Sequence, residues 1–217
     1  MPMKKLLFLM MALLSVILFT GCPGKEPEHI DLGSIPEKYL ATVPYADGDV
    51  FYLQHESDRM VIPFHVTRTR SFNEGSDFYD YGMEKMKPAP SVYFHYEVDY
   101  TVCRPDYPLF DIEITLSNGY MADSVYYQQS VFRHKYAHLA CQGFYASIPF
   151  IGEPTDLFTV HDSLEVNGHT YYDVFEFANQ GQDCQGISIQ TAYFNYEKGV
   201  IALKMSNGEK YMLYEEE

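Results

Sequence analysis

The sequence predicts an all-β protein, an antiparallel meander of strands that forms a sandwich or a partly open barrel. Apolar and polar residues alternate with a period of two over most of the chain from Asp49 onward, as they do in half-buried strands. The chain holds 20 Tyr and 15 Phe residues but no Trp, and these aromatic residues favour strands. Asn-Gly pairs, which favour type I′ hairpin turns, occur at 118–119, 167–168 and 207–208 between strand-like flanks.

The chain begins with the pattern of a secretory signal peptide. Lys4 and Lys5 precede the apolar run 6–19, which is too short to span a bilayer as a stable helix. Small residues follow the run, as they do before a cleavage point. We therefore expect residues 1–21 to be a leader that is removed after Gly21.

The end of this leader, Leu18-Phe19-Thr20-Gly21-Cys22, resembles the lipobox of bacterial lipoproteins. In that family the cysteine and the new amino terminus are acylated, so the resemblance implies a membrane anchor at Cys22. Phe19 departs from the usual Leu, Val or Ile, and an ordinary signal peptide followed by a chance cysteine is the alternative. Pro23 replaces the aspartate that often marks inner-membrane retention, which implies the outer membrane, on its periplasmic or cell-surface side.

The predicted mature chain consists of a tether and one domain. Residues 22–38 carry three prolines, several charges and little apolar periodicity, which predicts a flexible tether after the lipidated Cys22. Residues 39–217 are long enough for a single well-cored β-domain. Without residues 1–21, thirteen basic residues face thirty acids, a formal charge of −17 that excludes nucleic acid as a partner.

Period-two alternation locates the individual strands. It is clearest in Val92–Val102, which we expect to pair with Phe110–Leu116 as a long antiparallel hairpin. Val98 and Ile114 are expected to face inward, together with the apolar residues two positions away on each strand. The other strands are expected at Val50–His55, Met60–Thr69, Phe144–Phe150, Asp156–Val166, His169–Phe177, Ile187–Tyr196, Val200–Met205 and Lys210–Tyr214.

Four acids of the predicted hairpin form a candidate cation site. With the apolar residues inward, Glu97 and Asp99 would lie across from or diagonal to Asp111 and Glu113 on the outward face. Like charges so placed repel one another. A hard cation such as calcium, which prefers carboxylate oxygens, would relieve that repulsion.

The alternative to a cation site is a solvated acidic face that salt screens. Arg68 or Arg70, from another expected strand, would then neutralise part of the charge. Calcium is the only cofactor hypothesised, because the chain has no CxxC pair of the kind that binds zinc.

The segment Ser124–Cys141 fits two structures. Val125, Phe132 and Tyr136 lie on one face of a helix, with Ser124 as its cap. The Val and Tyr content of the same segment favours a strand. The sequence therefore leaves open one short helix in an otherwise all-β chain.

Three cysteines remain once Cys22 is lipidated. Cys103, Cys141 and Cys184 allow one disulfide and one spare thiol, in three pairings that the sequence does not separate. The segment 182–186 resembles the caspase nucleophile motif around Cys184, but it lies in a polar loop of an all-β chain, with an acid beside the thiol. No catalytic residue is predicted.

The C-terminal part carries a second resemblance. The runs Tyr193–Ile201 and Asn207–Leu213, with Val166–Tyr171 before them, are similar to the C-terminal ends of small uncharacterised lipoproteins of the Bacteroidetes. The resemblance implies an envelope role and brings no catalytic residue with it. We therefore predict a noncatalytic outer-membrane lipoprotein whose β-domain binds a ligand or envelope protein. The alternative classes are an envelope hydrolase with an unrecognised carboxylate pair and a purely structural surface component.

Overall fold

The structure is a computed structural model, and it describes residues 28–76, 92–106, 110–121, 124–135, 142–149, 151, 159–179 and 187–216. The all-β prediction is confirmed, because these residues form twelve strands and one helix of four residues. The predicted leader, Cys22, Cys141 and Cys184 lie outside the described residues. The elements are β1 (Glu28–Asp31), α2 (Glu37–Leu40), β2 (Val50–His55), β3 (Val61–Ser76), β4 (Val92–Pro105), β5 (Asp111–Met121), β6 (Ser124–Lys135), β7 (Gln142–Ile148), β8 (Thr159–Val166), β9 (His169–Ala178), β10 (Ile189–Asn195), β11 (Gly199–Met205) and β12 (Lys210–Tyr214).

The chain divides into two compact units. The smaller comprises residues 1–30 and 75–94, and in its described part the ring of His29 stacks on Tyr93 with centroids 5.2 Å apart. The larger comprises residues 31–74 and 95–217.

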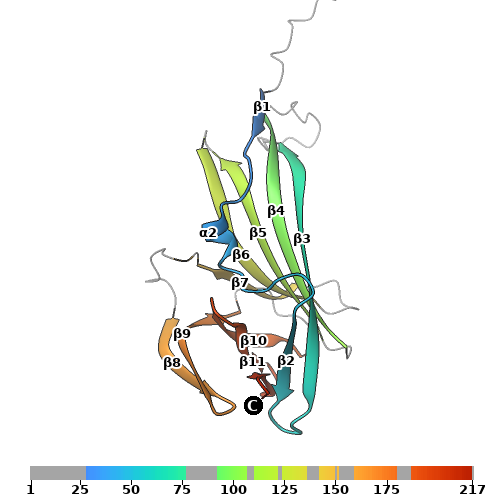
Figure 1. Cartoon of the computed structure of the whole chain (residues 1–217), viewed down its shortest axis with the longest axis vertical. Helices are drawn as coiled ribbons and strands as arrows, with labels where there is room; N and C mark the ends of the chain where they lie inside the picture. The colour runs from blue at the N-terminus through green and yellow to red at the C-terminus, as the bar shows by residue number, and fades with distance from the viewer. Residues whose placement is uncertain are drawn as a thin grey trace, which may run out of the picture. The chain divides into compact units, whose positions relative to one another are not determined.

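The strands of the larger unit follow one another as a meander (Figure 1). Their order is β7-β6-β5-β4-β3-β2-β12-β11-β10-β9-β8, so every neighbour is also adjacent in sequence except β2 and β12. The pairing of β12 with β2 joins the C-terminal strand to the first long strand, with Leu213 opposite Leu53. At one end of the path, β7 contacts β9 and β10, so the sheet folds back over its own face. In the described residues no ladder joins β7 to β8, so the sheet stays open.

One apolar core lies between the two parts of this folded sheet. Phe64, Ile112 and Phe144 come from the β3–β7 part, and they belong to the same buried cluster as Leu53 and Leu203 from the β2–β12–β11 part. All five side chains have at most 1% of their surface exposed. Burial of this apolar surface is the main force that holds the two parts together.

Two of the three predicted Asn-Gly turns are confirmed as turns. Asn167 and Gly168 join β8 to β9 with φ angles of 49° and 82°, the positive values that a type I′ turn requires. Asn207 and Gly208 join β11 to β12, although only the glycine has a positive φ, of 89°. The third turn is wrong, because Asn118 and Gly119 lie inside β5 and pair with Tyr127 and Tyr126 of β6.

The described part of the segment that fitted both helix and strand, Ser124–Lys135, is a strand. β6 pairs with β5 on one side and β7 on the other, so its described residues, Ser124–Lys135, lie inside the sheet. The tertiary pairing therefore decides in favour of the Val and Tyr content. The only helix of the described residues is α2, which spans the predicted boundary at residue 39 between tether and domain.

The orientation of β4 is the main correction to the sequence analysis. The period of two is confirmed, but the inward side is the other one: Glu97, Asp99, Thr101 and Cys103 are buried. Asp99 faces Leu116 and Cys103 faces Ile112, both of which point into the molecule on β5. Side chains alternate between the two faces of a strand, so an error of one residue in the predicted orientation assigns each side chain to the wrong face.

Candidate functional site

The four predicted acids do not form one patch. Glu97 and Asp99 are 4% and 1% exposed on the inner face of β4. Glu113 is opposite Val102 on the other face, and Asp111 binds the exposed Arg104 there, with 3.2 Å between Oδ2 and Nε. The expected like-charge cluster is therefore split between two faces, and its two halves meet different partners.

Arg68 of β3 neutralises Asp99 and holds the N-terminal segment in place. Its Nε lies 3.0 Å from both carboxylate oxygens of Asp99, and Nη2 binds Oδ2 as well. The remaining N–H groups donate to the carbonyl oxygens of Leu40, Val43 and Tyr45, at 3.1, 3.0 and 2.6 Å. Arg68 thus uses all five of the donors of a guanidinium group. The Leu40 carbonyl ends α2, so Arg68 also caps this helix.

Arg70 and Glu97 form a second ion pair two residues along each strand. Nε and Nη2 of Arg70 donate to the two oxygens of Glu97 at 3.0 and 3.1 Å, a bidentate arrangement. Oε2 of Glu97 also accepts the backbone N–H of Ile35 at 2.6 Å. Arg68 and Arg70 therefore neutralise Asp99 and Glu97, as one expectation had it, but they do so on the buried inner face and not on a solvated outer face.

Asn118 completes what we call the inner cluster, which consists of Arg68, Arg70, Glu97, Asp99 and Asn118. Its Oδ1 accepts the Glu97 backbone N–H at 2.8 Å, and its Nδ2 donates to the carbonyl oxygens of Leu32 and Gly33 at 3.3 and 3.0 Å. The side chain is 2% exposed. Asn118, which was expected in a hairpin turn, is thus a buried residue whose hydrogen bonds hold the N-terminal segment against β5.

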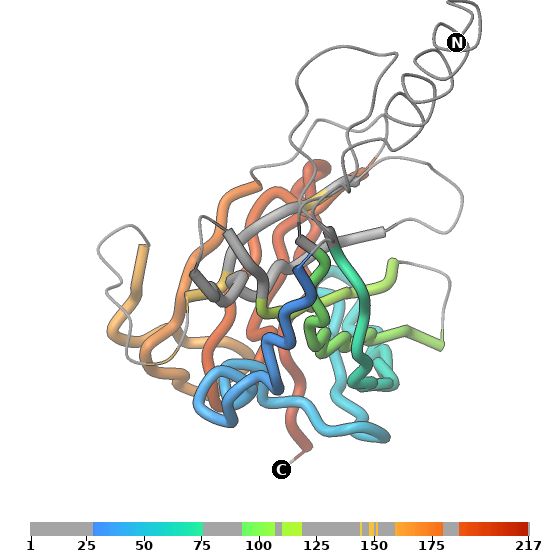
Figure 2. Tube along the Cα trace, turned by 90° about the horizontal axis from the view of Figure 1, so that it is seen from above, coloured from blue at the N-terminus to red at the C-terminus, as the bar shows by residue number. Residues whose placement is uncertain are grey.

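We call residues 32–49 the strap, because they cross the inner face of β3, β4 and β5 (Figures 1 and 2, blue). The strap begins where the Leu32 N–H donates to His95, seven residues before the predicted domain boundary at residue 39. Ile35 and Leu40 pack on Leu116. The Thr42 hydroxyl is the one buried side-chain oxygen of the strap that lacks a partner among the described residues.

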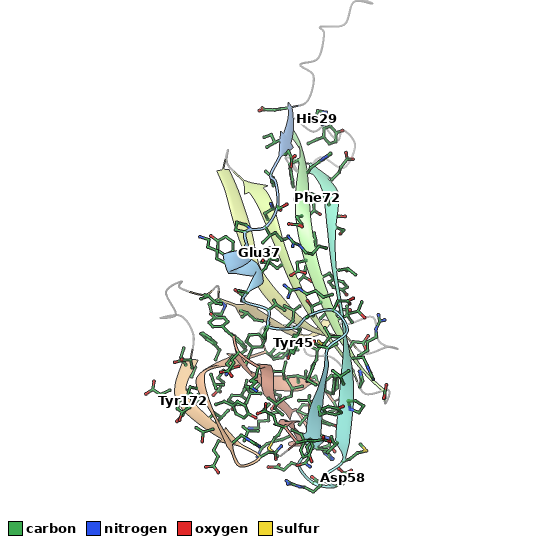
Figure 3. All side chains as sticks on the ribbon, viewed as in Figure 1. His29, Glu37, Tyr45, Asp58, Phe72 and Tyr172 are labelled. Carbon is green, nitrogen blue, oxygen red and sulfur yellow. The ribbon has the colours of Figure 1, made fainter. Side chains whose placement is uncertain are left out.

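Tyr45, near the end of the strap, links it to the far part of the sheet (Figure 3). Its hydroxyl accepts the Val200 N–H at 2.7 Å, and its ring stacks on Phe51 with centroids 5.0 Å apart. Burial raises the pKa of Tyr45 well above its usual value, so the hydroxyl stays neutral. Cys103 is a free, fully buried thiol whose pKa burial also raises, which makes it unreactive.

The polar groups of the inner cluster serve to stabilise the fold. The Asp99 carboxylate binds the Arg68 guanidinium. The Glu97 carboxylate binds the Arg70 guanidinium and the Ile35 N–H, so the oxygens of both acids are engaged within the fold. Among the described side chains, no three or more His, Cys, Asp or Glu groups are arranged to hold a metal ion.

A different region of the larger unit is open to solvent. A pocket of about 300 Å³, here called the outer pocket, lies over the β2–β12 ladder. Tyr52 and Tyr214 are directly opposite each other in that ladder, and both line the pocket. The remaining lining residues are Val50, Phe51, Lys198, Leu213, Glu215 and Glu216.

An ion pair and a tyrosine fix the polar side of the outer pocket. Lys198 Nζ lies 2.5 Å from Oε1 of Glu215, and the Tyr171 hydroxyl donates to Oε2 at 2.9 Å. The Lys198 ammonium lowers the pKa of Glu215, and the Glu215 carboxylate raises the pKa of Lys198. Burial, and then the hydrogen bond to Glu215, raises the pKa of Tyr171. Both members of the ion pair therefore remain charged near neutral pH.

The residues of the outer pocket could not be predicted from the sequence. The alternation of β2 and β12 predicts that Tyr52 and Tyr214 face outward, but nothing in the sequence pairs these two strands, which are more than 150 residues apart. The ion pair depends on the same long-range ladder.

The larger unit is thus all-β, with an ionic cluster on the inner face of the sheet and an open pocket over the β2–β12 ladder. No protein-family profile, curated protein sequence or solved structure matches the chain. In the part of the chain that the structure describes, no helix has the length and apolar character needed to cross a membrane.

Proposed function

We propose that this protein is a bacterial outer-membrane lipoprotein whose β-domain binds a ligand or partner without catalysing a reaction. The observation that carries the proposal is the lipobox-like segment Leu18–Cys22 directly after two lysines and an apolar run. Acylation of Cys22 would anchor the chain after the leader is removed.

The length of the anchored segment supports a domain held close to the membrane. Leu32 is the first residue of the strap, ten residues after Cys22. Even fully extended, ten residues reach about 35 Å. The larger unit would therefore stay within about one domain diameter of the lipid surface.

A binding role is supported by the outer pocket, and a hydrolase finds less support. Hydrolysis by two carboxylates needs one acid that holds a proton and one that is free to act as a base or nucleophile. Glu97 and Asp99 are the buried acids of the described residues, and each is bound by an arginine. Tyr52 and Tyr214, by contrast, are available to a ligand.

Acylation of Cys22 is the first point to test. The full chain is expressed in a bacterium with labelled palmitate, beside Cys22→Ser, and membranes are separated from soluble protein. We expect label and membrane association only with Cys22, and a mass for the N-terminal peptide that fits an acylated cysteine. Label-free, soluble wild-type protein would overturn the proposal. Protease shaving of intact cells then decides between the cell surface and the periplasm.

A further inference from the structure

The two tyrosines of the outer pocket differ from most tyrosines around them. Tyr52 is 39% exposed and Tyr214 is half-buried. In the described part of the chain, neither ring stacks on another ring and neither hydroxyl has a hydrogen-bond partner. The hydroxyls of Tyr45, Tyr171 and Tyr196, by contrast, bind Val200, Glu215 and Pro149.

Directly opposed residues of a ladder point to the same face of the sheet. Tyr52 and Tyr214 therefore project from the same face of the sheet, and each carries an aromatic ring and a hydroxyl that can donate or accept. The face of an aromatic ring is electronegative and attracts the C–H groups of a ligand, while the hydroxyl serves its polar groups. A ligand that binds both tyrosines therefore needs flat C–H surfaces and hydroxyl groups within a few ångströms of one another.

The charges beside the tyrosines narrow the ligand further. Lys198 and Glu215 cancel each other, and Lys198 retains two ammonium N–H donors beyond the one given to Glu215. The pocket can therefore exchange several hydrogen bonds without a cationic centre. The chain has a formal charge of −15, which disfavours an anionic ligand. The volume of about 300 Å³ is at the small end of ligand pockets, as expected for a short segment of a polymer.

We propose that the outer pocket binds a neutral oligosaccharide, with sugar rings stacked on Tyr52 and Tyr214 and sugar hydroxyls bonded to Lys198 and Glu215. Pyranose rings have the required combination of flat C–H faces and hydroxyl edges. The inference deepens the proposed function, since it names the ligand class and the site of the noncatalytic β-domain.

The test uses the full chain purified from bacterial membranes in detergent. Four neutral probes, cellohexaose, maltohexaose, xylohexaose and mannohexaose, are titrated by calorimetry, beside hexagalacturonate as an acid and choline as a cation. Tyrosine emission gives a second signal, because the chain has no Trp. Tyr52→Ala and Tyr214→Ala remove the ring faces. Tyr172→Ala is the matched control, since Tyr172 is 66% exposed on β9 and does not line the pocket (Figure 3).

We expect at least one neutral hexasaccharide to bind, and each pocket variant to weaken it roughly tenfold, with Tyr172→Ala unchanged. Equal unfolding midpoints of the variants show that the fold is intact. The site is wrong if no neutral probe binds, if only the acid or choline binds, or if Tyr52→Ala and Tyr214→Ala bind as tightly as the wild type.

The mass of the N-terminal peptide in the same preparation separates this inference from the proposed function. If the chain is acylated but binds none of the neutral probes, the inference of a sugar site is wrong and the proposal of a lipoprotein stands. If the chain binds a hexasaccharide through Tyr52 but carries no acyl group, the proposed lipid anchor is wrong and the inference of a sugar site stands.

Discussion

The inner cluster and the outer pocket contain similar chemical groups but have opposite roles. Each combines a basic side chain, a carboxylate and backbone or tyrosine partners, but Asp99 is 1% exposed, whereas the side chain of Glu215 is 32% exposed. Inside, Arg68 has an acceptor for every donor. Outside, the rings and hydroxyls of Tyr52 and Tyr214 have no partner among the described residues. The difference shows where polar groups are committed to the fold and where they remain available to a ligand.

The largest effect should come from breaking the inner cluster. In Asp99→Ala, the Arg68 guanidinium loses its counter-ion while still held under the strap, so we expect a loss of about 3–5 kcal/mol of the free energy of unfolding. Chemical denaturation measures it. Asp111→Ala is the control, because Asp111 binds the exposed Arg104, and it should cost less than about 1 kcal/mol. Equal losses in the two variants would contradict a structural role for the inner pair.

The contact between Tyr45 and β11 should give the next largest effect. Gly199 has a φ of 80°, and a Cβ atom there would overlap the Tyr45 hydroxyl. Gly208 has a φ of 89° with nothing near its Cβ position. Gly208→Ala should therefore cost about 1–2 kcal/mol of backbone strain, and Gly199→Ala clearly more. If the two unfolding free energies fall equally, Tyr45 does not pack on Gly199 as described.

Removal of a single hydroxyl oxygen, from Tyr45 inside or from Tyr52 outside, tests the same contrast between the two regions. Tyr45→Phe leaves the buried Val200 N–H without its acceptor, which should cost about 1–3 kcal/mol. Tyr52→Phe removes a hydroxyl that has no partner in the described chain, and its stability should change by less than about 0.5 kcal/mol. Thermal or chemical unfolding of both variants checks this. A destabilised Tyr52→Phe protein would mean that the outer tyrosine also serves the fold.

Local patterns in the sequence predicted much of the fold and little of either site. Alternation located β2 and β12 at their observed bounds, and the 167–168 turn followed from its Asn-Gly pair. The same alternation cannot say which side of β4 is buried, because its apolar residues and its acids are equally periodic. Glu97 and Asp99 are inside only because arginines of β3 neutralise them there.

Asn118 shows why the strap was missed. A polar residue before glycine predicts a turn, and a proline-containing segment with charges predicts a tether. The structure joins these two segments across 85 and 86 positions of sequence, through the bonds from Asn118 to Gly33 and Leu32. Such pairings depend on tertiary structure, and neither segment carries a local signal for the other.

The smallest effect should come from the ion pair of the outer pocket, and its response to pH and salt sharpens the contrast with the inner pair. The lowered pKa of Glu215 means that its contribution is present above the unfolded value of 4.5 and is lost as the pH falls through the folded pKa. The raised pKa of Lys198 means that its contribution is present below 10.5 and is lost as the pH rises through the folded pKa. Because both side chains are about one-third exposed, the whole contribution should stay below about 1 kcal/mol.

The measurement is the difference in unfolding free energy between the wild type and Lys198→Met, followed across pH and at low and high salt. We expect a plateau between the two pKa values and a smaller difference at high salt, because salt screens exposed charges more than buried ones. The corresponding difference for Asp99→Ala should hardly change with salt. If salt reduces both differences alike, the Arg68–Asp99 pair is as open to solvent as the outer pair, and the distinction between the two regions fails.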